Sequence, residues 1–167
     1  MSAKDEWFRV NEIAPGVFVI EERYHVQSYL VNGTDRSALI DTGMGFRNIR
    51  EAIAPLLRDE VIVLNTHWHF DHVGGNALFE ERGISPVERP LVEKGWRNAT
   101  LMDLHIEPCL SQGIPLPSGF VPKEYQIEGS SPTFEIRNGE RFALGDISVE
   151  KWHCRRRGFL RSRNKPK

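Results

Sequence analysis

The sequence predicts a mixed α/β domain with a layered architecture. Its 167 residues suit one domain with one substantial core. Short apolar and β-branched runs, typical of strands, alternate with a segment whose apolar residues recur at helical spacing. One strand-length run, residues 61–66 (VIVLNT), is almost continuously apolar and leads directly into a histidine-rich loop. Strands with interspersed helices favour a layered α/β fold.

The N-terminal part of the chain predicts three strands and one helix. The strands are apolar and rich in β-branched residues, and they cover residues 16–22, 26–33 and 37–43. The helix is predicted over residues 46–57, where isoleucine and leucine recur at helical spacing. Pro55 lies inside this run, so the helix should kink or end early.

The following elements are less regular. Residues 61–66 predict a strand buried on both faces, and residues 74–83 (GGNALFEERG) predict a short helix that ends at Gly83. Prolines, glycines and mixed polarity indicate a short helix and a long irregular segment over residues 86–122. Residues 133–152 predict further short strands, with Asn138-Gly139 as a hairpin turn.

Composition describes a soluble globular chain, with 40% apolar and 27% charged residues. Residues 1–16 contain no long apolar run, so we expect neither a signal peptide nor a transmembrane segment. Because Cys109 and Cys154 are the only cysteines, a disulfide framework is not expected. A cytoplasmic location is therefore predicted.

Charge changes abruptly near the C-terminus. All 23 acidic residues lie at or before Glu150, whereas the last 14 residues carry seven of the 22 basic side chains. Such a break indicates a disordered tail, an arm for nucleic acid or membranes, or foreign sequence. We predict a domain over residues 1–153 and a disordered basic tail over residues 154–167.

The stretch THWHFDHVGG at residues 66–75 concentrates residues that bind metals. In an extended backbone, His67 and His69 face the same way and can hold one ion together. Imidazole nitrogens suit zinc, and Asp71 and His72 could hold a second ion nearby. A His-x-His pair alone is most often surface chemistry, but four such residues in six positions after a buried strand predict a metal motif.

HWHFDH at residues 67–72 resembles the His-x-His-x-Asp-His signature of the metallo-β-lactamase-fold hydrolases. LIDTG at residues 39–43 is similar to that family's preceding strand, and the resemblance runs from about Gly16 to His153. It implies the α/β fold class of the αββα sandwich, with the first αβ half present and the second half incomplete. The implied activity is zinc-dependent hydrolysis of an ester, thioester, lactone or amide by a metal-activated water.

The resemblance also implies roles for individual residues. His67 and His69 would ligate a first zinc, and Asp71 and His72 a second, with iron or manganese as alternative metals. Asp71 would also be the catalytic residue that handles the proton. Asp41 would orient a metal ligand by hydrogen bonding, and its alternative role is to cap the turn after its strand.

Other residues with suitable chemistry are interpreted as structural. His25 and His105 match no ligand of the family, and we expect them to be solvated or core histidines. Cys109 has no visible His or Asp partner, so a nucleophilic role is not expected. The tryptophans are expected to pack, and Trp68, inside the motif, is a candidate for the mouth of a pocket.

The sequence departs from the family pattern near its end. In the family, a strand like ISVEKWH leads into a His-Thr-Pro-Gly-His segment, and the last His of that segment is the third ligand of the first zinc. Here CRRR follows His153, and Arg157 stands in the ligand's place, where a protonated guanidinium offers no lone pair. We interpret this as a truncation or reading-frame shift near His153 that would impair activity.

Two alternative functions stay open. One is a non-catalytic metal-binding or interaction fragment, in which the exposed sheet needs a partner or forms an oligomer. The other is a nucleic-acid-processing relative that uses the basic tail on phosphate backbones. The expected partner is a small-molecule substrate, with no membrane. Nucleic acid is less favoured, because the charge break falls inside a motif rather than at a linker.

Overall fold

The computed structural model describes residues 7–151. The predicted basic tail, residues 154–167, lies outside the described residues, and so do Trp152, His153 and Arg157. Within the described part, no helix is long and apolar enough to cross a membrane.

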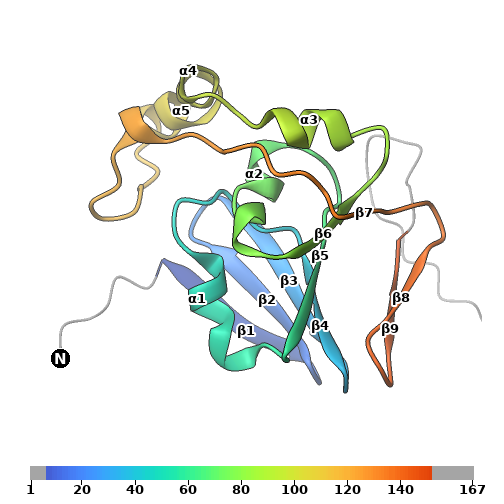
Figure 1. Ribbon diagram of the computed structural model, residues 1–167. Helices are drawn as coiled ribbons and strands as arrows, with labels where there is room; N and C mark the ends of the chain where they lie inside the picture. The colour runs from blue at the N-terminus through green and yellow to red at the C-terminus, as the bar shows by residue number, and fades with distance from the viewer. Residues whose placement is uncertain (1–6, 152–167) are drawn as a thin grey trace, which may run out of the picture.

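A seven-stranded sheet forms the centre of the described chain, and its strands lie in sequence order from β1 to β7 (Figure 1). The first four strands pair antiparallel, whereas β4 to β7 pair in parallel. The strands are β1 (Phe8–Ala14), β2 (Val17–Glu22), β3 (Val26–Asn32), β4 (Arg36–Ile40), β5 (Glu60–Leu64), β6 (Glu81–Ile84) and β7 (Phe134–Glu135). Strand β4 is therefore the junction between an antiparallel meander and a parallel segment.

Helix α1 (Ile49–Ile53) covers one face of the sheet. The Asn48 side chain caps it by accepting a hydrogen bond from the Glu51 backbone N–H. Pro55 opens a 3-10 turn, Ala54–Leu56, directly after it, so the helix is short, as the sequence predicts. Its two buried isoleucines pack in a core cluster with Ile20, Leu30, Leu39 and Val63 from the strands and with Phe79, which precedes β6.

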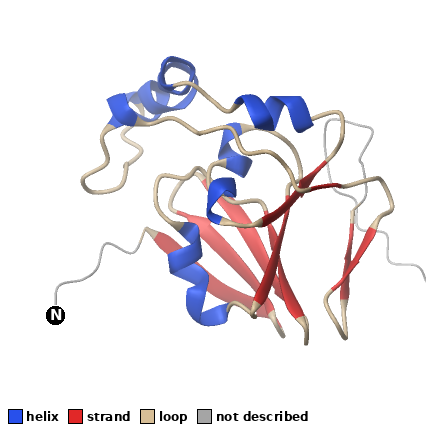
Figure 2. Cartoon of the chain, viewed as in Figure 1, coloured by secondary structure: helices blue, strands red, loops and turns tan. Residues whose placement is uncertain are grey.

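The opposite face packs against the segment that follows β7. Leu144 and Ile136 are fully buried there against Ala38, Ile62 and Leu64, which alternate along their strands with the residues facing α1. The segment contains a two-stranded hairpin, β8 (Arg141–Ala143) and β9 (Ser148–Glu150), which stands beside the sheet in Figure 2. The sheet is thus covered on both faces.

Several short helices lie over one end of the sheet (Figure 2). They are α2 (Phe70–Val73), α3 (Arg89–Lys94), α4 (Asn98–Leu101), a π-helical turn (Met102–Ile106) and α5 (Glu107–Ser111). This region is more helical than the sequence predicts. Pro90 stands in the first turn of α3, where proline starts a helix instead of breaking it. Pro108 lies inside the continuous helical run over residues 98–111, shortly after the π-helical turn, so this proline does not end the helix either.

The predicted helix over residues 74–83 is wrong. The structure has only a 3-10 turn, Asn76–Leu78, and Gly83 lies inside strand β6. The ring of Phe134 on β7 packs against this glycine, where a Cβ would lie 2.2 Å from Phe134 Cε2. Gly83 is therefore required for strand packing and does not end a helix.

The predicted hairpin at Asn138-Gly139 is also wrong in its pairing. A turn is present, with Gly139 at a φ of 79°. However, β7 before it pairs with β6, and β8 after it pairs with β9. The hairpin turn lies instead between β8 and β9, where the Leu144 N–H donates to the Ile147 carbonyl.

Candidate metal centre

The predicted metal motif lies where the parallel strands β4 and β5 end. Because they are parallel neighbours, their carboxyl ends meet at one edge of the sheet. Asp41 follows β4, and the loop with His67 and His69 follows β5. The two loops touch through their backbones: the Gly74 N–H donates to the Gly43 carbonyl, at 2.9 Å.

Glycine makes this close approach possible. Gly74 has an ordinary helical φ of −59°, so its backbone conformation does not require glycine. However, a Cβ at this position would lie 2.2 Å from the Met44 carbonyl carbon and oxygen. Any larger residue would therefore push the two loops apart.

Asp41 is the centre of the hydrogen bonding beneath the motif. Its buried carboxylate accepts hydrogen bonds from the Thr66 N–H, at 2.7 Å, and the Thr66 hydroxyl, at 2.6 Å. One of its oxygens also lies 2.7 Å from His72 Nδ1. The residue has a φ of 62°, which is uncommon outside glycine and is often retained at functional sites. These contacts hold the His72 ring with Nε2 pointing away from Asp41.

The four predicted ligands approach each other in two pairs. His67 Nε2 lies 3.1 Å from His69 Nδ1, and His72 Nε2 lies 3.3 Å from an Asp71 carboxylate oxygen. The His67 and His72 ring centroids are 4.0 Å apart, which brings the pairs together. The pairing is the one expected from the sequence, and metal ligation itself stays a prediction.

Charges within the motif shift its pKa values in opposite directions. Burial lowers the pKa of His72, but its hydrogen bonds to Asp41 and Asp71 outweigh burial and raise the pKa to about 9. Burial raises the pKa of Asp71, but the contact with His72 outweighs it, so the pKa is lowered. Burial and the neighbouring His72 and His69 lower the pKa of His67. The motif thus combines neutral and charged groups among its predicted metal ligands.

The donor set fits a divalent metal. Two nitrogens bound to one tetrahedral zinc lie about 3.3 Å apart, given Zn–N bonds of about 2.0–2.1 Å. The observed contact of 3.1 Å between His67 and His69 is close to this value. Imidazole and carboxylate are ligand types that zinc accepts.

Four further residues support the motif and were not identified from the sequence. Asn65 and Asn76 are buried and hydrogen-bond to each other, and Thr42 donates to the Asn76 side chain at 2.9 Å. Lys151, just after β9, donates to the carbonyls of Asn65 and Thr66, both at 2.8 Å. The asparagines could have been suspected from their place beside the motif. Lys151 is 85 residues from Thr66 along the chain and gave no such signal.

Trp68 lines a pocket of about 350 Å³ that includes none of the four predicted ligands, so its place at the mouth of the metal site stays a prediction. The Trp68 ring stacks on Trp96, with centroids 4.8 Å apart and planes within 8°. The basic residues Lys94 and Arg97 also line this pocket. Trp7 is buried in the core, in agreement with its predicted packing role.

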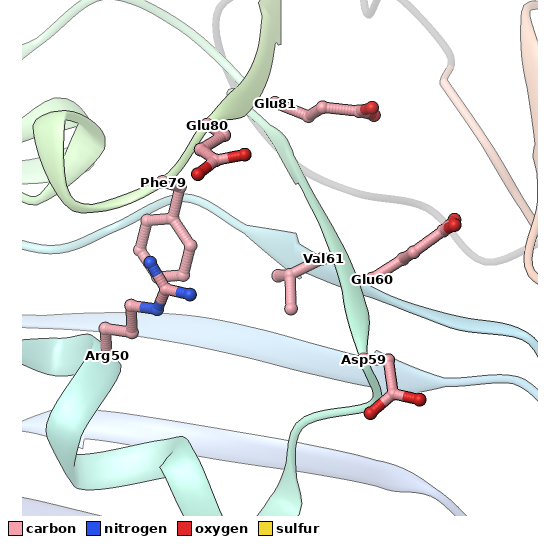
Figure 3. Close-up of a pocket in the computed structure, with 7 residues that line it drawn as sticks. All are labelled: Arg50, Asp59, Glu60, Val61, Phe79, Glu80 and Glu81. Atoms are coloured by element: carbon pink, nitrogen blue, oxygen red, sulfur yellow. The ribbon is translucent and has the colours of Figure 1, made fainter.

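A second pocket contains none of the motif residues. It is lined by Arg50, Asp59, Glu60, Val61, Phe79, Glu80 and Glu81. In Figure 3, the Arg50 guanidinium lies beside the Phe79 ring, 5.7 Å from its centroid, whereas the Glu60 and Glu81 carboxylates point away from that ring. This pocket contains no histidine or cysteine, and so we do not assign it to the metal centre.

His25, His105 and Cys109 come together, contrary to the expectation that Cys109 has no histidine partner. His25 Nδ1 lies 2.9 Å from His105 Nε2, and Cys109 Sγ lies 3.4 Å from the same nitrogen. Both histidines are half-buried among aromatic rings, which agrees with the expectation of core histidines. The sequence offers no signal for this contact, because 80 residues separate the two histidines.

Comparison with known proteins decides the family. The sequence profile described as the metallo-beta-lactamase superfamily matches residues 22–139. The chain belongs to this superfamily. The matched range contains Asp41 and the whole of the histidine motif.

Curated superfamily relatives include thioesterases. The chain is 27% identical over 165 residues to "Acyl-coenzyme A thioesterase MBLAC2" of Bos taurus, and 26% identical to the Homo sapiens protein of that name. Each match covers 89% of this chain and 58% of the relative, so the chain spans less than two thirds of their length. Over 53 residues it is 47% identical to "Atrochrysone carboxyl ACP thioesterase" of Aspergillus terreus, covering 29% of this chain and 16% of that protein.

Solved metallo-β-lactamases have the same fold. The subclass B3 enzyme BJP-1 of Bradyrhizobium japonicum matches with a TM-score of 0.62 at 19% identity, covering 90% of this chain and 54% of the other. GOB-18 of Elizabethkingia meningoseptica also matches with a TM-score of 0.62, at 20% identity. This match covers 92% of this chain and 54% of GOB-18. These likenesses confirm the predicted metallo-β-lactamase fold, of which the chain spans about half.

Proposed function

We propose that this chain carries the zinc-binding motif of a hydrolase that cleaves acyl thioesters. The observation that carries the proposal is the meeting of His67 with His69 and of Asp71 with His72, above the buried carboxylate of Asp41. The names of the curated relatives support a thioester over the other esters and amides that the fold could serve.

The residues at the site have different proposed roles. His67, His69, Asp71 and His72 would hold the metal. When bound, a divalent metal lowers the pKa of a coordinated water and polarises a carbonyl group. Asp41 is a positioning residue, because its carboxylate fixes the His72 ring through Nδ1. The Asp71 side chain is 35% exposed and its lowered pKa keeps it ionised, so it offers a carboxylate at the open side of the site. Its proposed part in proton transfer rests on this position and not on its basicity.

The pocket beside Trp68 supports a substrate with a phosphate-bearing thiol carrier. The stacked Trp68 and Trp96 rings offer an apolar surface, while the exposed side chains of Lys94 and Arg97 provide positive charge beside it. Coenzyme A and acyl-carrier proteins both present the acyl group on a long arm that ends in phosphate. Basic side chains bind phosphate through charge-assisted hydrogen bonds.

The test measures thiol release from acyl-coenzyme A substrates of different chain lengths by the purified chain. We expect turnover that a chelator abolishes and zinc restores, and that His69→Ala lowers by at least tenfold. The matching oxoester serves as the control substrate. Absence of turnover with zinc bound at the motif would contradict the proposed activity of this chain.

The pocket is tested separately by charge removal. Lys94→Ala and Arg97→Ala should raise the KM for acyl-coenzyme A and leave the KM for a short acyl thioester without phosphate unchanged. Lys123→Ala is the matched control, because Lys123 is exposed and lines no part of the pocket that contains Trp68. An equal change in KM for both substrates would show that the pocket does not recognise phosphate.

A further inference from the structure

Three potential metal ligands meet at a place that the metal motif does not use. They are His25, His105 and Cys109, and one ligand atom from each lies within 4.8 Å of the other two. His25 comes from the turn between β2 and β3, and the other two come from the helical segment near residue 105. Neither of these histidines, nor the cysteine, is part of the motif at residues 67–72.

The His25 ring is held in the tautomer that metal binding requires. Its Nε2 lies 3.2 Å from the Pro115 carbonyl oxygen, which can only accept, so Nε2 carries the hydrogen. Nδ1 of the neutral ring therefore keeps its lone pair, which accepts the hydrogen bond from His105 Nε2, 2.9 Å away. A backbone carbonyl that fixes the far nitrogen of a histidine is a recurrent feature of metal sites.

The helical segment presents His105 and Cys109 together. They are four residues apart, so they lie on the same helical face. His105 lies in the π-helical turn Met102–Ile106, a rare conformation that is found frequently at functional sites. Cys109 Sγ is 3.4 Å from His105 Nε2, close to the roughly 3.5 Å expected for nitrogen and sulfur on one zinc.

Aromatic side chains surround the cluster. The His25 ring lies 5.5 Å from Trp7 and 5.1 Å from Phe46, and the His105 ring lies 5.5 Å from Phe70. Cys109 is only 4% exposed. Burial lowers the pKa of both histidines, which favours uncharged rings that keep a lone pair for a metal. Burial also raises the pKa of the Cys109 thiol, so a metal must displace the thiol proton to bind there.

We propose that His25 Nδ1, His105 Nε2 and Cys109 Sγ bind a zinc ion at a site separate from the motif. Two nitrogens and one thiolate are ligands that zinc prefers, and a fourth position is left for water or another ligand. On binding, the thiol of Cys109 releases its proton to solvent. The hydrogen on His105 Nε2 moves to Nδ1 of that ring, so one proton is released in total.

Cobalt(II) titration of the full chain tests this site, because a thiolate bound to cobalt gives an intense charge-transfer absorption in the near ultraviolet. The motif contains no sulfur, so the band reports a site that includes a cysteine, and the cysteine variants distinguish Cys109 from Cys154. We expect the band in the wild-type chain and in His67→Ala/His69→Ala. It should be lost in Cys109→Ser and kept in Cys154→Ser, the matched control for the other cysteine.

Two further measurements keep the test decisive if Cys109→Ser does not fold. His25→Gln and His105→Gln should each lower the cobalt affinity of this site at least tenfold, as measured by titration of the thiolate band. Equilibrium dialysis should find one zinc fewer per chain in each folded variant, with circular dichroism as the check on folding. The proposal is overturned if wild-type chain saturated with cobalt lacks the band, or if the band survives Cys109→Ser or disappears in Cys154→Ser.

Discussion

Asp41 and His72 are joined by a contact of 2.7 Å across 31 residues of sequence. The contact links the loop after β4 to helix α2, and it uses the nitrogen of His72 that does not face Asp71. Because Asp41 also binds the backbone and the hydroxyl of Thr66, one carboxylate positions both the beginning and the end of the motif.

Asp41→Ala should weaken zinc binding at the motif by about 10–100-fold without removing a ligand. Competition with a chromophoric chelator measures this change. Asp41→Asn is the matched control for the backbone, because asparagine tolerates the left-handed conformation at a φ of 62° better than alanine does. An unchanged affinity in a folded Asp41→Ala variant would mean that the carboxylate has no part in metal binding.

Glu22 should make the stability of the fold depend on pH. Burial raises the pKa of this carboxyl to about 7, although hydrogen bonds from Trp7 and from the backbone of Met44 and Phe46 oppose the shift. The unfolded chain releases the proton near pH 4.5, whereas the folded chain keeps it until about pH 7. The free energy of unfolding should therefore fall as pH rises through this window.

Urea unfolding of Glu22→Gln at several pH values measures this effect. The variant should lose that part of the pH dependence, because glutamine does not titrate. It should also be less stable by about 1–3 kcal/mol, since its NH₂ group faces a donor where Glu22 accepts from both Trp7 Nε1 and the Met44 N–H. If the free energy of unfolding changed equally with pH in both proteins between about pH 4.5 and 7, the pKa of Glu22 would not be raised by folding.

Gly74→Ala should destabilise the fold and weaken metal binding together. The added Cβ would overlap the Met44 carbonyl and force the two loops apart, at a cost of about 1–3 kcal/mol. Gly113→Ala is the control, because its Cβ would meet nothing within 4 Å and only its φ of 69° is strained. The thermal midpoint and the zinc affinity are measured for both variants. A loss of zinc affinity in both variants, or in neither, would contradict the role of the loop contact.

Lys151→Met should loosen the start of the motif. The methionine keeps most of the apolar stem but removes both hydrogen bonds from the ammonium group to the Asn65 and Thr66 carbonyls. Hydrogen bonds from charged groups contribute about 1.5–3 kcal/mol each. Amide hydrogen exchange of residues 65–72 should therefore become faster, while Lys123→Met leaves it unchanged. Unaltered exchange in Lys151→Met would show that the loop does not depend on Lys151.

Local sequence patterns predicted those elements that depend on neighbouring residues. The strand over residues 26–33 and the shortened helix before Pro55 follow from periodicity and from the chemistry of proline. Strand β6 was missed, because Gly83 is required by the ring of Phe134, which is distant in sequence. Packing against another element is not encoded in the local pattern.

The same distinction holds for the sites. His67, His69, Asp71 and His72 were recognisable because all four fall within six positions. The contact of His25 with His105 joins residues 80 positions apart, and it exists only once β2, β3 and the π-helical turn have assembled. No spacing rule for adjacent ligands could have found it.

The change of pairing at β4 has a kinetic consequence. The meander of β1 to β4 contains contacts between neighbours in sequence and can form early, whereas the parallel pairing of β4 with β5 must close a longer loop. Asp41 meets Thr66 and His72 only after that second step. The ability to hold a metal should thus be acquired late in folding, so that metal present during refolding captures nearly finished chains and slows their return to the unfolded ensemble.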